Sequence, residues 1–471
     1  MKLKGINVQK AIEGIEIQLE REKDISPELK AAIKILIIIV NILINKLGIN
    51  SKNSSKPPSE DKNRERGSNR EKSNKKPGGQ KGHIGKRLSK VKNPDIIEEI
   101  KIDRRKLPKG KYKEIGYEAR QVFEIRISRE ITEYRAQIIE DEKKKRYVAK
   151  FPEFVKKEVQ YGLGVKCNTV YMSQFQLVPY NRIQDQCIDQ MKLPISTGTI
   201  FNFNKEAYNK LEYFEKLVKE KILKSELIHV DETGINVNKK LVWLHSTSNK
   251  KWTYFYPHKK RGSEAMDEIG ILPKFEGIIC HDHWKPYYKY NNCTHALCNA
   301  HHKRELTKAE EAKQKWARIM KKLLLKINKA VEKGGGVLEK EKIDYYKKRY
   351  RKILKLAEKI ECPIPKRKKG QRGRLKKSKS RNLLERLQNY EEDVLRFMKN
   401  KIVPFTNNLG ENDLRMTKVQ QKISGCFRSM NGAYMFCRIR SYLSTCRKNN
   451  VSSTDALRLL FQGKLPAFLK T

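Results

Sequence analysis

Two aspartates stand where apolar segments of strand length end. Asp231 directly follows residues 227–230, and Asp282 follows residues 277–280 after one histidine. A carboxylate at the end of a strand leaves the core and lies at the edge of the sheet. Two such carboxylates on neighbouring strands can share hard divalent cations, which prefer oxygen ligands. The sequence therefore predicts a cation site formed by Asp231 and Asp282.

A third carboxylate, from a helix packed on the sheet, would complete a two-metal site. Glu411 is the candidate, in a helix expected to begin near Asn408 and to run through Arg415. In such a site one metal activates the attacking hydroxyl and the other stabilises the leaving oxygen of a phosphoryl displacement. The spacing of the three acidic residues, 51 and then 129 positions, does not decide the matter.

Each acidic residue also has a purely structural interpretation. Asp231 opens a polar Asp-Glu-Thr-Gly turn, where aspartate is common for local hydrogen bonding. Asp282 could cap the helix that follows it. Residues 408–411 have the form of a capping box, in which Glu411 would bond only backbone N–H groups. Both interpretations stay open at the level of spacing.

Histidines and cysteines form a second constellation. Within 22 positions lie His281, His283, Cys293, His295, Cys298, His301 and His302. Cys298-x-x-His301 places sulfur and nitrogen one helical turn apart, which suits zinc. Adding Cys293 and His295 would give four ligands, but this spacing is tight for a structural zinc knuckle. The favoured interpretation is a small buried Cys298 and a hydrogen-bonded His301, without zinc.

The charge of the chain indicates its partner. The 471 residues suffice for two or three domains, and 104 Lys+Arg against 54 Asp+Glu give a net charge of +50. A compact particle of this charge repels itself unless an anionic partner offsets it. Nucleic acid is the first candidate and an anionic membrane the second. A membrane surface is disfavoured because the basic residues are not gathered on one amphipathic helix.

The cysteines and apolar segments indicate a soluble cytoplasmic protein. Nine sparse cysteines do not form a disulfide framework, so a reduced, intracellular protein is expected. The first 21 residues lack the pattern of a signal peptide. The most apolar stretch, residues 35–45, is too short to span a bilayer, which takes about 20 residues.

The N-terminal half divides by composition. Residues 1–50 form a helical segment with a heptad seam: Leu29, Ile33, Leu36, Val40, Leu43 and Leu47. Burial within the chain and self-association through this seam both stay open. Residues 51–95 are a basic flexible linker, and residues 96–155 alternate apolar and charged side chains as in a small antiparallel sheet. Residues 156–222 are helical.

A helix-turn-helix pattern lies in that helical region. Residues 182–191 and a second helix capped by Ser196 flank Leu193-Pro194, and this pair predicts DNA binding. Farther on, residues 310–400 are helical and very basic, with ten Lys/Arg in the sixteen positions 366–381. Such a run is either a solvated loop or a phosphate contact.

Seven stretches together resemble one family across nearly the whole chain. They are NSSKPPSED (53–61), KPGGQKGH (76–83), HVDETGINVNKKLVWLHS (229–246), HDHWKPYYKYNNCTHALCNAHHKREL (281–306), SKSRNLLERL (378–387), PFTNNLGENDLRMTKVQQKISGCFRS (404–429) and RIRSYLSTCRKN (438–449). The chain resembles the DDE transposases of the insertion sequence 66 family.

The resemblance implies an α/β, RNase-H-like catalytic core, a mixed sheet with flanking helices. The core would comprise residues 223–310 and 401–450, interrupted by a helical insertion at 311–400, with a C-terminal helix and tail at 451–471. The family's acidic residues match Asp231, Asp282 and Glu411. Asp413 lies on another side of the same helix and is not chosen. Cys298 and His301 match a C-x-x-H pair thought to support such cores.

The resemblance also implies the reaction and its partners. A transposase binds the inverted repeats at the ends of its element, and two Mg²⁺ (or Mn²⁺) would serve strand cleavage and strand transfer. The expected partners are double-stranded DNA, further copies of the chain and element-encoded accessory proteins, at the nucleoid of a bacterium. The phosphate contacts expected near the site are Lys285, Arg415, Lys418 and Arg428.

One feature departs from the family pattern. Family members commonly carry a zinc-finger-like segment with two C-x-x-C pairs, whereas this chain has no cysteine before Cys167. Zinc is therefore not expected in the region 96–155. Two alternatives to an active transposase stay open: a DNA-binding remnant without catalysis, and a nuclease of the same fold that cuts without joining.

Overall fold

A computed structural model describes residues 2–3, 6–22, 24–47, 88–363, 375 and 377–470. The predicted linker up to residue 87 and most of the basic run 366–381 lie outside the described residues. Within the described ranges, no helix is both long enough and apolar enough to cross a membrane.

A five-stranded mixed sheet forms the centre of the fold. Its strands are β5 (Leu227–Val237), β6 (Lys240–Ser248), β7 (Thr253–His258), β8 (Ile278–His281) and β9 (Thr294–Leu297). Their order is β7-β6-β5-β8-β9; β5, β6 and β7 are antiparallel neighbours, whereas β5, β8 and β9 run parallel. Asn238 and Lys239 join β5 to β6 with φ of 47° and 61°, as in the two-residue turns that match strand twist.

The register of β5 and β8 brings the two aspartates together. His229 pairs with Cys280 in this parallel ladder. Asp231 and Asp282 each lie two residues farther along, so the parallel pairing brings them to the same level of adjacent strands. Asp282 follows the end of β8, whereas β5 continues through Asp231 to Val237, so the expectations that Asp231 ends a strand or opens a polar turn are wrong. The proximity expected from the sequence thus follows from parallel pairing.

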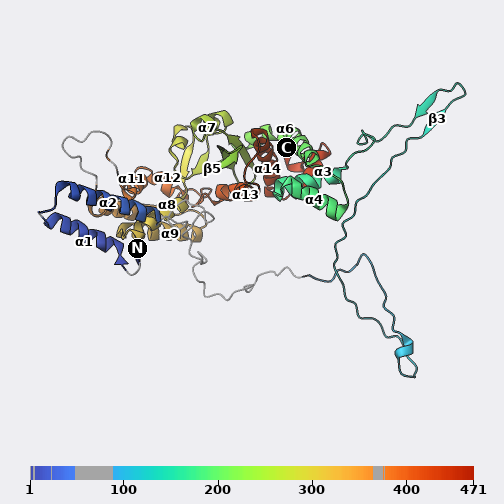
Figure 1. The fold of residues 1–471 in the computed structure, drawn as a ribbon, viewed down its shortest axis with the longest axis horizontal. Helices are drawn as coiled ribbons and strands as arrows, with labels where there is room; N and C mark the ends of the chain where they lie inside the picture. The colour runs from blue at the N-terminus through green and yellow to red at the C-terminus, as the bar shows by residue number, and fades with distance from the viewer. Residues whose placement is uncertain are drawn as a thin grey trace.

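Helices cover both faces of this sheet. On one face α13 (Asn408–Ser424) packs against β5 and β6, and α14 (Met430–Lys448) packs against β7. On the other face lies α7 (Ser263–Ile269), as Figure 1 shows. The mixed α/β architecture expected from the sequence is confirmed. The apolar cluster under α13 and α14 includes Leu244, Phe255, Leu414 and Phe436.

Among the described residues, five α-helices lie between β9 and α13 in the sequence. They are α8 (Asn299–Glu311), α9 (Lys315–Lys333), α10 (Lys340–Ile360), α11 (Lys379–Asn389) and α12 (Glu391–Leu395). Their apolar faces build a separate core that includes Trp316, Leu324, Tyr350 and Leu384. This core reaches the sheet through Leu297 of β9.

A third group of helices packs beside the sheet. It comprises α3 (Leu163–Val170), a π-helical turn (Tyr171–Phe175), α4 (Tyr180–Met191), α5 (Thr197–Lys210), α6 (Glu212–Leu223) and α15 (Ser453–Phe461). Ser196 caps α5, with its Oγ accepting from the N–H of Thr199 at 3.1 Å. One face of α5 is buried through Ile200, Phe203 and Ala207. DNA binding by α4 and α5 stays a prediction.

The region 96–155 contains less regular structure than its alternating pattern predicts. Its strands form one exposed hairpin, β3 (Ile138–Glu140) with β4 (Arg146–Val148), besides a short 3₁₀ turn at Arg104–Lys106. The remaining chain runs extended away from the helices (Figure 1). Alternation favours extended backbone, but Ile100 and Ile115 are 97% and 95% exposed, so no covering layer stabilises a sheet.

The N-terminal segment is a helical hairpin preceded by two short strands, Lys2–Leu3 and Ile6–Asn7. α1 (Val8–Arg21) and α2 (Pro27–Leu47) meet through Ile12, Leu19 and Ile37. Ile33 of the predicted seam is partly buried there. The seam residues Leu29, Leu36, Val40 and Leu43 are exposed. Burial within the chain thus accounts for only part of the seam, and self-association stays a prediction.

Candidate active site

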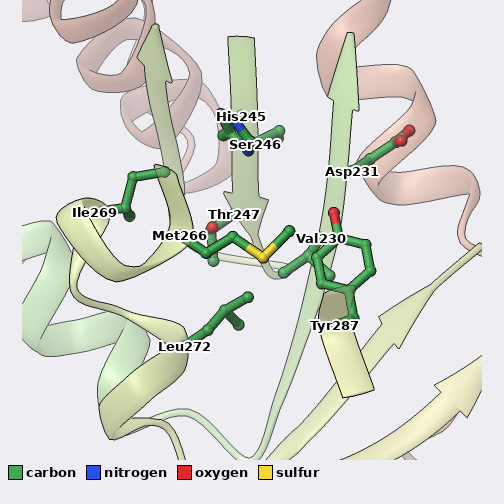
Figure 2. A pocket seen from close by; sticks show the side chains of 9 residues that line it. All are labelled: Val230, Asp231, His245, Ser246, Thr247, Met266, Ile269, Leu272 and Tyr287. Atoms are coloured by element: carbon green, nitrogen blue, oxygen red, sulfur yellow. The ribbon is translucent and has the colours of Figure 1, made fainter. Parts of the chain in front are cut away.

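Asp231 lies on β5, the central strand of the sheet. Its Oδ1 accepts from the N–H of Glu232 at 2.9 Å. A small cavity beside β5 is lined partly by the α7 side of the core, including Met266 and Leu272. Figure 2 shows the carboxylate of Asp231 pointing away from these apolar side chains. The carboxylate is therefore directed away from the α7 side of β5, toward the face on which α13 packs.

Asp282 directly follows β8 in a strained loop. Its Oδ1 accepts from the N–H of Trp284 at 2.9 Å. The next residue, His283, has φ of 73°, a left-handed conformation that is uncommon for a non-glycine residue. The loop leads into a 3₁₀ helix at Lys285–Lys289. The N-cap of that helix is Trp284, without a side-chain cap hydrogen bond, so the capping interpretation is wrong and the bond from Asp282 orders the turn before the helix.

Glu411 lies in the first turn of α13 and faces α8. Its carboxylate oxygens lie 3.5 Å from Arg304 Nη2 and 3.9 Å from His301 Nδ1. These contacts are with side chains of another helix. The capping-box interpretation gives no account of them, because it would direct Glu411 to the backbone of its own first turn.

The three predicted carboxylates influence one another. Burial raises the pKa of Asp231 well above its usual range, and the charges of Glu232, Asp282 and Glu411 raise this pKa further. Carboxylates gathered in this way repel one another unless a cation lies among them. The donor set is all oxygen, which fits Mg²⁺ or Mn²⁺.

A buried asparagine fixes α13 to the central strand. The Oδ1 of Asn407 lies 2.6 Å from His229 Nδ1, its Nδ2 donates to the carbonyl of Val230 at 3.0 Å, and its backbone N–H donates to Cys298 Sγ at 3.0 Å. A Cβ on Gly410 would lie 3.1 Å from Oδ1 of the same amide. Asn407 therefore sets where Glu411 stands relative to β5. Asn407 is not among the residues expected from the sequence, in which its place just before the helix is the one signal for it.

Asp413, the neighbouring acidic residue on α13, has a different environment. Its Oδ2 accepts from the ammonium of Lys448 on α14 at 2.7 Å. Both side chains are largely buried, at 14% and 17% exposure. Asp413 thus ties α13 to α14 rather than facing α8 as Glu411 does.

Comparison with known sequences identifies the family of the chain. A sequence model described as "Transposase IS66 family" matches residues 158–435, more than half of the chain. The chain belongs to the IS66 transposase family. A second model, a family of unknown function (DUF6444), matches residues 8–89. No curated protein matches the chain. Membership indicates an enzyme that acts on DNA, and Asp231, Asp282 and Glu411 all fall within the matched range.

Beside Asp231, the IS66 family member carries an acidic residue that the sequence analysis passed over. Glu232 Oε1 accepts from Arg261 at 2.7 Å, and its Oε2 accepts from the hydroxyl of Tyr287 at 2.5 Å. Burial, followed by the charge of Asp282, raises the pKa of Glu232. The guanidinium of Arg261 stacks between Trp243 and Trp284, with centroid distances of 4.7 and 4.3 Å. The contacts of Glu232 with Arg261 and Tyr287 therefore connect β5 to the segment after β8.

The predicted phosphate contacts of the transposase differ in availability. Lys285, Arg415 and Arg428 are exposed. Lys418 is instead partly buried, and its Nζ donates to the carbonyl of Gly234 on β5 at 3.0 Å. Lys418 therefore helps to dock α13 on the sheet, whereas the other three side chains are open to a phosphate backbone.

The cysteines and histidines of the family member separate into two groups. Cys293 Sγ and His295 Nε2 both contact the carbonyl of Tyr290, at 3.4 and 3.2 Å. Cys298 and His301 lie instead beside Glu411. Burial raises the pKa of Cys298 to about 11 and lowers the pKa of His301. The four-ligand zinc knuckle considered from the sequence is thus not assembled.

Proposed function

We propose that the chain binds the ends of its mobile element and catalyses metal-dependent cleavage and transfer of DNA strands. Asp231, Asp282 and Glu411 would hold two Mg²⁺ or Mn²⁺ ions. The observation that supports this proposal is the placement of Asp231 on β5, Asp282 after β8 and Glu411 on α13, near enough for the charges of Asp282 and Glu411 to raise the pKa of Asp231. Among the described residues the three carboxylates do not converge within 4.8 Å of one another, so a bound cation would have to draw them together.

The sheet supports an RNase-H-like core. Three antiparallel strands are followed by two parallel ones, in the sequential order 3-2-1-4-5. This order places the first and fourth strands side by side, so Asp231 within β5 and Asp282 just after β8 lie at the same level of the sheet. The helical insertion α9–α12 separates this edge from α13 in sequence but not in space.

The bound cations would activate the attacking hydroxyl and stabilise the leaving oxygen of the phosphodiester. The residues of the chain prepare this chemistry. Asn407 fixes the helix that carries Glu411, and Glu232 with Arg261 braces the loop that carries Asp282. Lys285, Arg415 and Arg428 would hold the phosphate backbone by charge.

The same function implies partners. Double-stranded DNA is the substrate, at the element ends and at the target, which would place the protein at the nucleoid. Joining two ends in one complex would need at least two copies of the chain. Element-encoded accessory proteins are a further expectation from the family resemblance.

The test is cleavage of a labelled element end by purified protein with Mg²⁺. Asp231→Asn should lower the cleavage rate by at least about a thousandfold, roughly 4 kcal/mol of transition-state stabilisation, and leave end binding nearly unchanged. Asp267→Asn is the matched control and should cleave normally, because Asp267 pairs with Lys289 away from the three carboxylates. Retained cleavage by Asp231→Asn would sink the assignment.

The reaction products separate the alternatives. Strands covalently joined to target DNA are expected from a transposase and would exclude a nuclease that only cuts. End binding without any metal-dependent nicking by the unchanged chain would indicate a DNA-binding remnant.

A further inference from the structure

A second set of ligand atoms overlaps the proposed active site. Cys298 Sγ, a ring nitrogen of His301 and a carboxylate oxygen of Glu411 all lie within 4.8 Å of one another. Cys298 precedes α8, His301 lies in the first turn of α8, and Glu411 lies in the first turn of α13. Two helix starts therefore bring together a sulfur, a nitrogen and an oxygen donor.

Two of these atoms are buried without a hydrogen-bond partner. His301 Nδ1 and Glu411 Oε1 make no hydrogen bond to any described residue, although they lie only 3.9 Å apart. Leaving such buried polar atoms unsatisfied costs about 1–3 kcal/mol each. A cation between them would coordinate both lone pairs, and Cys298 Sγ lies within reach of the same point.

The surrounding groups hold the three ligands in place. The backbone N–H of Asn407 donates to Cys298 Sγ, which fixes the position of this sulfur. Arg304 contacts the other carboxylate oxygen of Glu411 at 3.5 Å, which leaves Oε1 turned toward His301. The negative charge of Asp282 acts on His301 from nearby and offsets the cationic Arg304.

The donor set selects a class of metal. Thiolate, imidazole and carboxylate together suit Zn²⁺ and similar ions, whereas Mg²⁺ takes oxygen ligands. Zinc lies about 2.0–2.3 Å from such donors, so the ligand atoms need to close by only about an ångström. Three protein ligands would leave one position open.

We propose that Cys298, His301 and Glu411 form a site for a thiophilic divalent cation of the Zn²⁺ class. Binding there engages Glu411, so that this ion and the Mg²⁺ of the proposed reaction compete for one carboxylate. The competition rests on the proposed function, whereas the binding of the thiophilic ion does not. The proposed site keeps Cys298 and His301 of the zinc set considered from the sequence and has Glu411 in place of Cys293 and His295.

The experiment uses Co²⁺ as a spectroscopic probe on the full chain. Coordination by a thiolate should produce a charge-transfer absorption in the near ultraviolet that Zn²⁺ removes and Mg²⁺ in large excess does not. Cys298→Ser should abolish this absorption. Cys293→Ser is the matched control and should keep it, because Cys293 is also buried but contacts Tyr290 instead.

A second variant guards against misfolding of Cys298→Ser. His301 is more accessible, with 17% of its side chain exposed, and His301→Gln should weaken Co²⁺ binding at least about tenfold with an unchanged circular dichroism spectrum. The variant Asp231→Asn/Asp282→Asn should keep the absorption, which separates this site from the proposed catalytic one. No absorption by the unchanged chain, or the same absorption in Cys298→Ser and His301→Gln, would overturn the proposal.

Discussion

At the scale of single residues, Asp231 and Asp413 show how environment separates two similar carboxylates. Burial, followed by the like charges around it, raises the pKa of Asp231. Asp413 faces the ammonium of Lys448 at 2.7 Å. A group whose pKa is raised in the folded state destabilises the fold when it is ionised, whereas a paired carboxylate stabilises it.

This contrast predicts opposite effects of the same substitution. At pH 7.5 without divalent cations, Asp231→Asn should raise the free energy of unfolding by about 1 kcal/mol, because it removes a repelled charge. Asp413→Asn should lower it by about 2 kcal/mol, because Lys448 loses its partner. Urea denaturation measures both. Equal effects of the two variants would contradict the electrostatic account.

Buried histidines predict how stability depends on pH. Burial lowers the pKa of His245 to about 4 from its ordinary value near 6.5. Between pH 6.5 and 4, His245 binds a proton in the unfolded chain but not in the folded one. The free energy of unfolding should therefore decrease as the pH falls from 6.5 toward 4. Above pH 6.5, His245 makes it neither larger nor smaller. The loss should be on the order of 2 kcal/mol.

Denaturation between pH 7.5 and 4.5 tests this dependence in the unchanged chain and in His245→Gln. Other buried histidines, such as His302, act in the same direction. The variant should therefore keep part of the pH dependence and lose the share of His245. An identical pH profile in both proteins would show that His245 does not contribute.

At the scale of elements, the start of α13 decides where Glu411 stands. Asn407 spans from β5 to Cys298, and a Cβ at Gly410 would crowd its amide at 3.1 Å. Glycine is favoured at position 410 because the Asn407 amide lies close to it, and not because the backbone adopts a left-handed conformation. The first turn of α13 is thus fixed by tertiary contacts, although the sequence alone places a helix there.

A pair of glycines tests this role. Gly410→Ala should destabilise the fold by about 1–2 kcal/mol, because its Cβ would displace the Asn407 amide. Gly432 occupies the same third position of α14, and its Cβ would lie 3.6 Å from Ser429 Oγ, an ordinary contact. Gly432→Ala should be neutral or stabilise by up to about 1 kcal/mol. Thermal unfolding compares the two, and a similar loss in both would remove the special role of Gly410.

At the scale of the whole molecule, the net charge of +50 dominates. The cores of the described residues are built from apolar clusters, so the excess of Lys and Arg lies mainly on the surface and along the extended chain. Such a field attracts DNA without reading its sequence, and it weakens steeply with salt as counterions are released.

The salt dependence of DNA binding measures individual contacts. The triple variant Lys285→Ala/Arg415→Ala/Arg428→Ala should reduce the slope of log Kd against log salt concentration by about 3, roughly one per phosphate contact. Lys418→Ala is the control and should leave the slope nearly unchanged, because its Nζ is engaged by Gly234. Fluorescence anisotropy between 50 and 300 mM salt, about the useful range for such binding, measures both slopes. An unchanged slope in the triple variant would place the phosphate contacts elsewhere.

The sequence by itself determined the local elements and the candidate acidic residues. Apolar runs of strand length, the Ser196 cap and the helix near Asn408 depend on neighbouring residues, so they could be read directly. The family resemblance rests on such local stretches as well. Alternation in the region 96–155 predicted a small antiparallel sheet, and only one hairpin forms there. Alternation is also a local pattern, which specifies extended backbone but not a covering layer.

Only the tertiary structure decided what surrounds each acidic residue. The contacts of Asn407 with Val230 and Cys298, and of Glu411 with His301, join residues more than a hundred positions apart. No local periodicity encodes such contacts, because they arise when the cores pack and bring the starts of α8 and α13 together. Packing therefore places Glu411, which the sequence predicted as one catalytic carboxylate, where two proposed metal sites share it.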